Sequence, residues 1–309
     1  MSEPRSIPLP TAPSQGISAR RIRFVTQLPA GTRARNKFRQ PRVCHAIEEP
    51  VELANLPRDR PWPEPTDGLL VLHMPRNAPA DWQRFGETWM TPADHPEAVQ
   101  PITLQGKGRT MYWRPGRALI VGDRQQKGSK KGPPPAGMPE DVLAALVDFA
   151  FHEGELRSLE SAIKIGETSM NEDVGRAFKI RFRDRTAWPH FAAMTEHFGR
   201  LRVVYTLLEP RLASAPRTLP GISQRWVERL CELAHIEDRL EDASNRIENG
   251  EFLYGEANDR IADYKGYHLG HMLEIVIILL LVLEVAISSV DTYGHIVLDH
   301  QSQEADDDE

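Results

Sequence analysis

The chain has 309 residues, 40% hydrophobic and 27% charged, which is enough apolar material for one large or two ordinary domains and excludes a chain disordered throughout. Its only cysteines, Cys44 and Cys231, exclude a disulfide framework and a cysteine-based zinc site, and they are typical of a reducing compartment. The net charge of −6 is mild but uneven, because the N-terminal part is basic and the C-terminal end is acidic.

Residues 1–66 are basic and rich in proline and show neither helical nor strand periodicity, so we predict a disordered N-terminal arm. Residues 1–45 hold nine Lys or Arg against one acid, Glu3. A flexible basic segment can contact phosphates, and we predict that the arm binds anionic lipid or RNA, with a solvated tail as the alternative. The basic side chains concerned are Arg20, Arg21, Arg23, Arg33, Arg35, Lys37, Arg39 and Arg42.

Residues 67–124 are predicted to form a small α+β module. Short apolar runs bounded by Gly, Pro or charged residues indicate strands at residues 68–73, 110–113 and 117–122, with a helix at about 81–89. Residues 125–138 are rich in Lys, Gly, Ser and Pro and cannot pack a core, so they are predicted to be a linker.

Residues 139–250 change to a helical period and are predicted to be a helical domain with long amphipathic helices. Three helices are expected at about 139–167, 172–183 and 189–212. A fourth, long amphipathic helix is expected from Ser223 to Asn249-Gly250, with charges opposite its apolar face. This pattern favours a coiled coil or packing on the other helices. The fold class is therefore α+β and mostly α.

Residues 251–292 are predicted to be a helix that includes a transmembrane segment at 269–290, followed by an acidic tail at 293–309. The segment of 22 residues would be about 33 Å long, against a hydrocarbon core of roughly 30 Å. Its fourteen Leu, Ile or Val contribute about −4 to −8 kcal/mol, whereas a central carboxylate costs about +2.5 kcal/mol or more. Insertion is therefore favoured, and the alternative is a helix buried in a soluble core.

The flanking charges predict the topology of this single-pass protein. Lys265 is the last basic residue, and the C-terminal tail has no Lys or Arg. The positive-inside rule then places the body on the cytoplasmic or matrix side. Because Pro8, Pro10 and Pro13 interrupt any secretory signal, we expect the bacterial inner membrane, with the mitochondrial inner membrane as the alternative.

Polar residues on the predicted span are candidates for assembly. A carboxylate inside a membrane must be neutral, paired or facing water, and Glu284 has Ser288 one turn further along the same face. We therefore predict that Glu274, Glu284 and Ser288 contribute to a homo-oligomer. At the start of the span, His268, His271 and Glu274 share a helix face and are weak candidates for metal ligands, with interfacial hydrogen bonding as the alternative.

The segment at residues 271–284 has two acids, Glu274 and Glu284, on either side of an aliphatic run. It resembles the C-terminal segment of the required-for-meiotic-nuclear-division (sporulation) family, and residues 151–160 and 219–226 agree with two upstream features of that family. The resemblance covers residues 139–290. It implies a membrane-anchored, oligomeric protein whose eukaryotic relatives lie in the mitochondrial inner membrane and support mitochondrial translation. It implies no catalytic residues.

The sequence contains no phosphate-binding P-loop, no dinucleotide fingerprint and no Gly-x-Ser-x-Gly elbow, so we predict no catalytic residue and no cofactor. The favoured function is a membrane-anchored oligomeric scaffold or tether. One alternative is an oligomeric channel or transporter subunit with Glu284 near its axis. The other is a soluble enzyme in which the apolar helix is core.

Overall fold

The computed structural model describes residue 10 and residues 16–40, 42–56, 68–90, 101–106, 108–122, 138–179, 182–214 and 218–306. The chain divides into two compact units. Unit 1 comprises Met1–Asn171 and Glu196–Glu251, and unit 2 comprises Glu172–Thr195 and Phe252–Glu309.

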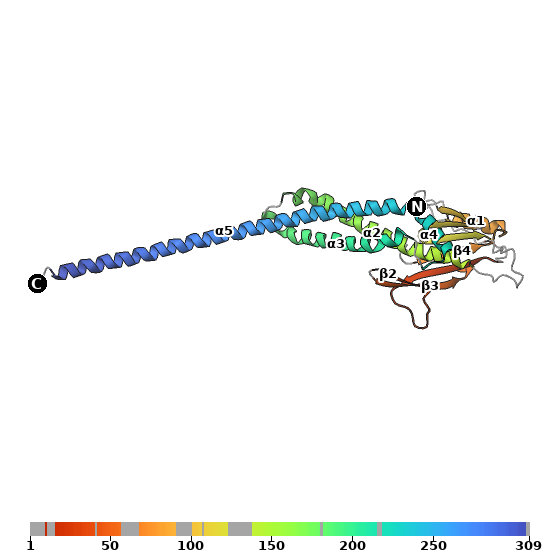
Figure 1. Cartoon of the computed structure of the whole chain (residues 1–309), viewed down its shortest axis with the longest axis horizontal. Helices are drawn as coiled ribbons and strands as arrows, with labels where there is room; N and C mark the ends of the chain where they lie inside the picture. Colours follow the sequence, from red (N-terminus) through yellow and green to blue (C-terminus); the bar gives the residue numbers. More distant parts are fainter. Residues whose placement is uncertain are drawn as a thin grey trace, which may run out of the picture. The chain divides into compact units, whose positions relative to one another are not determined.

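Unit 1 contains a seven-stranded sheet in the order β2-β3-β1-β4-β7-β6-β5 (Figure 1). All neighbouring strands are antiparallel except β4 and β7, which are parallel. The strands are β1 (Ser18–Val25), β2 (Asn36–Gln40), β3 (Arg42–Val51), β4 (Gly68–Met74), β5 (Ile102–Gly106), β6 (Arg109–Arg114) and β7 (Arg117–Gly122).

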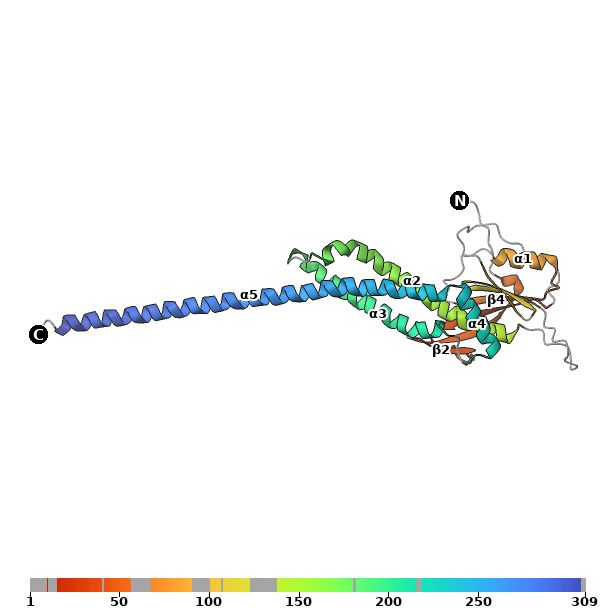
Figure 2. The same cartoon turned by 45° about the horizontal axis from the view of Figure 1, so that its top comes forward.

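Every residue of the central strand β4 is buried, because helices cover both faces of the sheet. On one face lies α1 (Ala80–Met90), whose Trp82, Phe85 and Trp89 pack against β4 and β7. The opposite face packs against α2 (Glu140–Ala177) through the stacked rings of Phe38 and Phe151 and through edge-to-face contacts such as that of Trp113 with Phe149. Figure 2 shows this layered arrangement around β4.

The remaining elements are mostly helical. They are η1 (Leu53–Asn55), η3 (Phe182–Ala187), α3 (Trp188–Leu212), α4 (Gly221–Leu233) and α5 (Ile236–Asp306). In unit 1 the first part of α5 runs parallel to α2, and acids of α2 spaced by seven residues meet arginines of α5 with the same spacing. We name this set the charge ladder: Glu153, Glu160 and Glu167 of α2 with Arg239 and Arg246 of α5.

The charge ladder contains bidentate pairs. Arg239 donates to both carboxylate oxygens of Glu160 at 2.7 and 2.8 Å and to Glu153 at 3.2 Å, and Arg246 donates to both oxygens of Glu167. The hydrogen bonds from Arg246 hold the pKa of Glu167 below its usual value. The apolar face of this stretch of α5 is buried within the chain. A coiled coil between chains remains a prediction.

Phe198 of α3 contacts both α2 and α5, and so fixes how the three long helices of unit 1 align along their lengths. Its ring is fully buried and lies against two glycines, Gly166 of α2 and Gly250 of α5. A Cβ on Gly166 would stand 2.7 Å from the ring, and one on Gly250 would stand 2.3 Å from it. Both positions therefore require glycine for close approach rather than for a turn.

Unit 2 has a polar contact in its own helical core. The buried carboxylate of Asp173 accepts a hydrogen bond from the Tyr254 hydroxyl at 3.0 Å and lies 2.6 Å from Nε2 of His190. Burial and the bond to Asp173 raise the pKa of Tyr254. Asn258 of α5 donates to Thr195 of α3 at 2.7 Å. These contacts join the parts of α2, α3 and α5 that belong to the unit.

The structure confirms an α+β chain that is mostly α, with the strands expected at 68–73, 110–113 and 117–122 and the helix at 81–89. The prediction of disorder over the arm is wrong for residues 18–25, 36–40 and 42–51, which form β1, β2 and β3. The physical reason is that Ala19 and Ile22 are buried in the sheet while Arg20, which lies between them, pairs with Glu48. The other arm residues, 1–9, 11–15 and 57–66, and most of the 125–138 linker lie outside the described residues.

Three of the expected helices also differ from the prediction. The helix expected at 172–183 is instead the end of α2, which continues to Ala177. The helix expected from Ser223 to Gly250 is two helices, because His235 adopts a left-handed conformation with φ of 51° between α4 and α5. Gly250 packs against the Phe198 ring and does not end a helix. Helix α5 therefore continues past Gly250 to Asp306, beyond the expected end at 292.

Candidate functional site

The most unusual surface of the described chain is the apolar part of α5 at residues 269–289. It lies in a helix long and apolar enough to cross a membrane, and none of its most apolar stretch is buried. The exposed fractions of its large apolar side chains run from 48% at Ile277 to 72% at Leu269. Soluble proteins rarely leave so continuous an apolar surface open to water. The fold therefore suits an α+β protein with one membrane-anchoring helix.

This exposure bears on the soluble-enzyme alternative, which requires the same residues to be core. Among the described residues, nothing covers them. A helix satisfies its own backbone hydrogen bonds, so α5 meets the main requirement for passing through hydrocarbon.

At the start of the apolar segment, two of the three proposed metal ligands lie together. Nδ1 of His271 is 2.9 Å from Oε2 of Glu274, and both side chains are exposed. His268 is exposed on the preceding turn. Within the described part of the chain, no group of three or more His, Cys, Asp or Glu could hold a metal ion. The arrangement is a hydrogen bond between two exposed side chains at the start of the apolar segment.

The assembly candidates Glu284 and Ser288 are both exposed on α5, one helical turn apart. Exposure is what a contact with a second chain requires. The homo-oligomer itself remains a prediction, as does the part played in it by Glu274.

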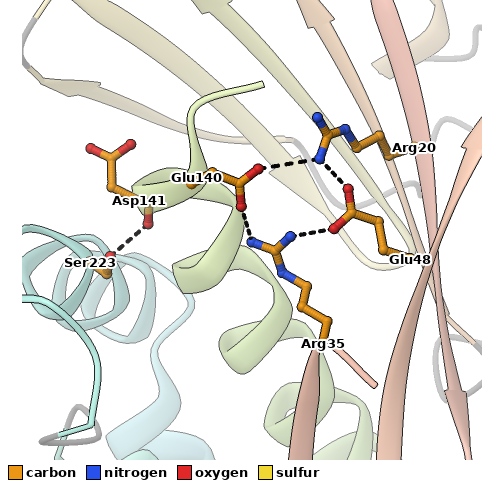
Figure 3. Close-up of polar contacts among 6 residues, drawn as sticks. All are labelled: Arg20, Arg35, Glu48, Glu140, Asp141 and Ser223. Carbon is orange, nitrogen blue, oxygen red and sulfur yellow. Dashed lines mark hydrogen bonds and ion pairs between the residues drawn. The ribbon is translucent and has the colours of Figure 1, made fainter. Parts of the chain in front are cut away.

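The basic residues of the predicted arm have other partners than expected. Arg20 of β1 and Arg35, just before β2, both pair with Glu48 of β3, and both reach Glu140 in the first turn of α2 (Figure 3). Nη2 of Arg35 donates to Glu140 at 2.6 Å, and Nη1 of Arg20 donates to it at 3.3 Å. Burial would raise the pKa of Glu140, but the hydrogen bond and charge of Arg35, aided by Arg20, hold it below its usual value.

The adjoining residue Asp141 fixes the same end of α2 to two further elements. Arg109 of β6 donates to its carboxylate at 3.0 and 3.1 Å, and the hydroxyl of Ser223 in α4 donates to its backbone carbonyl at 2.8 Å, as Figure 3 shows for Ser223. Acids at a helix N-terminus also interact favourably with the helix dipole. The polar cluster of Figure 3 is therefore a structural junction.

Fewer arm residues than predicted are open for an external partner. Arg21, Arg33 and Lys37 are exposed, whereas Arg23 pairs with Glu49 at 3.4 Å. The side chains of Arg39 and Arg42 lie outside the described residues. Among the described side chains of the arm, Arg21, Arg33 and Lys37 are therefore the ones open to a contact with phosphates.

A groove of about 600 Å³ lies in unit 1 between the edge strand β5 and helix α4. The ring of Trp226 packs over Gly106, where a Cβ would stand 3.1 Å from it, and Ile222, Arg225 and Arg229 complete one wall. No local sequence pattern indicates this groove, because its two walls come from segments far apart in the chain. It contains no pair of acid and base that would indicate catalysis.

Burial perturbs the two cysteines and one glutamate of unit 1. Burial raises the pKa of the Cys231 thiol to about 12, and it raises the pKa of Cys44, with Glu155 adding to the effect on Cys44. Both thiols are therefore protonated at neutral pH and are poor nucleophiles. Burial likewise raises the pKa of Glu155.

No family model and no curated protein matches this chain. Among solved structures, the chain is similar to the CorA magnesium transporter from Methanocaldococcus jannaschii, with 7% sequence identity over 84% of this chain and 80% of that chain. The TM-score is 0.33, and a likeness at that level says nothing about function.

Proposed function

We propose that this protein is a membrane-anchored scaffold or tether. The observation that carries the proposal is the uncovered apolar segment of α5, whose large side chains are all at least 48% exposed over residues 269–287. Transfer of such side chains to hydrocarbon is favourable by about 0.3–0.6 kcal/mol for each Leu, Ile, Phe or Val. The folded sheet and helices of unit 1 then form the part that the anchor holds at the membrane.

Flanking charge supports an orientation with the body on the cytoplasmic or matrix side, because Lys265 is the last basic residue and residues 291–309 hold no Lys or Arg. We propose the bacterial inner membrane, with the mitochondrial inner membrane as the alternative. The resemblance to the required-for-meiotic-nuclear-division family, stated above, supports a role in membrane-associated assembly or in translation at a membrane.

The test of the anchor is alkaline carbonate extraction of membranes from cells that express the full-length chain. We expect the protein to stay in the pellet, since hydrophobic insertion resists high pH. The matched control is a variant in which Ile277, Leu280 and Leu283 are each replaced by Asp, which should be released. Release of the parent chain as freely as a soluble marker would overturn the proposal.

A further inference from the structure

The connection between α2 and α3 in unit 2 lies beside α5 just before the apolar segment begins. The ring of Trp188 packs edge-on against Tyr264 at 5.9 Å between centroids, and Nζ of Lys265 lies 5.3 Å from the Trp188 ring. Lys265 is four residues from Leu269, which is about 6 Å along a helix. We name the described residues 174–179 and 182–188 the α2–α3 tip. If α5 spans a membrane from Leu269, the tip ends at the level of the lipid headgroups.

The α2–α3 tip is strongly basic. Residues 176–188 contain five Lys or Arg and one acid, Asp184. Arg176, Lys179 and Arg185 are exposed, and none has an ion-pair partner among the described residues. This differs from Arg20 and Arg35, which pair with Glu48 and Glu140 inside unit 1.

The same tip also exposes apolar side chains. Phe178 is 47% exposed and Val174 is 48% exposed. The guanidinium of Arg260 lies 5.0 Å from the Phe178 ring and donates to the carbonyl of Ala177 at 3.2 Å, which fixes the end of α2 against α5. Aromatic rings beside basic groups are typical of the boundary between water and lipid, where the ring is half in each phase.

We propose that the α2–α3 tip is a second membrane contact, which binds anionic lipid headgroups on the side of the membrane that holds the body. It rests on the proposed anchor, because α5 must cross the membrane to bring the tip to its surface. Arg176, Lys179 and Arg185 contact the headgroup phosphates, and Phe178 enters the interface. The contact is electrostatic, so it weakens as salt rises and is stronger on an anionic bilayer than on a neutral one.

The test uses the full chain in nanodiscs, with Cys44→Ser and Cys231→Ala removing the native thiols. A fluorophore is attached at Thr186→Cys, an exposed position in the tip, and quenching by a lipid with a nitroxide on its headgroup is measured. The reference label is at Thr206→Cys, an exposed position of α3 that lies about 27 Å along the helix from Trp188. We expect a loss of fluorescence at position 186, larger in discs containing phosphatidylglycerol than in phosphatidylcholine alone, and little loss at position 206.

A charge variant gives the second measurement. Arg176→Gln, Lys179→Gln and Arg185→Gln together should remove the extra quenching in anionic discs, whereas the same change at Arg21, Arg33 and Lys37 should leave it. Quenching at position 186 no greater than at 206, or unaffected by the tip variant, would overturn the contact alone. A chain that fails to enter the discs contradicts the anchor and, with it, the tip.

Discussion

The ring of Phe198 lies directly against the backbone of Gly250, so closely that a Cβ on Gly250 would stand 2.3 Å from Cε1 of the ring. Gly250→Ala should therefore push α5 away from α3 and lower the free energy of unfolding by about 1–3 kcal/mol. Chemical denaturation of the detergent-solubilised chain measures the change.

The control for this substitution lies in the same helix. A Cβ on Gly255 would meet nothing within 4 Å, so Gly255→Ala should stabilise α5 by up to about 1 kcal/mol through helix propensity. Two alanines that changed stability equally would contradict the packing of Phe198 on Gly250.

The charge ladder predicts a second effect on stability. Glu153 is 1% exposed and is paired with Arg157 and Arg239, so Arg239→Met leaves a buried carboxylate with one partner instead of two. We expect a loss of about 2–4 kcal/mol, below the full cost of an unpaired buried charge because Arg157 remains. The same denaturation experiment on Arg200→Met should show a change within about 1 kcal/mol, since the pair of Arg200 with Glu196 is exposed.

The junction at the start of α2 predicts an acid-sensitive contribution to stability. Because the pKa of Glu140 is lower in the folded chain, its pairing with Arg35 and Arg20 stabilises the fold above a pH of about 4.5, the ordinary pKa of a glutamate, and is lost as pH falls through the lower folded value. Glu140→Gln should lower stability at pH 7 by less than about 1 kcal/mol, because the side chain is largely exposed. Denaturation at pH 7, 5 and 3 should show the gap between parent and variant closing at the lowest pH. A gap that widened on acidification would contradict this pairing.

The exposed basic residues of β1 and the region before β2 predict a salt-dependent interaction with anionic lipid or RNA. Arg21→Gln, Arg33→Gln and Lys37→Gln together should weaken binding to an unstructured RNA or to phosphatidylglycerol vesicles and reduce its dependence on salt. Stability should stay unchanged, because none of the three has an ion-pair partner among the described residues. Binding that ignores both salt and the triple substitution would remove the partner role.

Assembly through the span gives the last prediction. A neutral Glu284 that meets a neighbouring chain or Ser288 gains a hydrogen bond of about 0.6–2 kcal/mol in the membrane. Glu284→Leu should insert at least as well as the parent but form a less stable oligomer, whereas Glu284→Gln keeps a donor and an acceptor and should retain most assembly. Mass measurement of the three solubilised proteins at matched concentration compares them. An unchanged oligomer in Glu284→Leu would leave assembly to the helices outside the membrane.

The parts of the fold that a local sequence pattern defines could be predicted, and the parts that depend on contacts between distant residues could not. The strand β4 and the apolar segment of α5 were found because composition and length alone define them. The strands β1 to β3 were missed because their arginines suggested a solvated arm. Their partners Glu48 and Glu140 lie 28 and 120 residues from Arg20, so pairing is visible only after folding.

The same distinction holds for the candidate site, because some of its parts follow from local sequence and others do not. The anchor and its two glutamates were read from one continuous stretch, whereas the tip depends on Trp188 lying beside Tyr264, which no local pattern contains. Gly250 shows where the rules for helix ends fail. An Asn-Gly pair normally ends a helix, but here the missing side chain of Gly250 makes room for Phe198.

The charge ladder repeats every seven residues, so sliding α5 along α2 by two turns would still let Arg246 pair, with Glu153 and Glu160 in place of Glu167. Charge pairing of this kind selects which faces meet but tolerates more than one register. Phe198 removes the ambiguity, because only one alignment places both Gly166 and Gly250 against the same ring. The two glycines, which have no side chains, thus fix the register of α5 against α2 and α3. Helix α5 is the one that continues into the apolar segment.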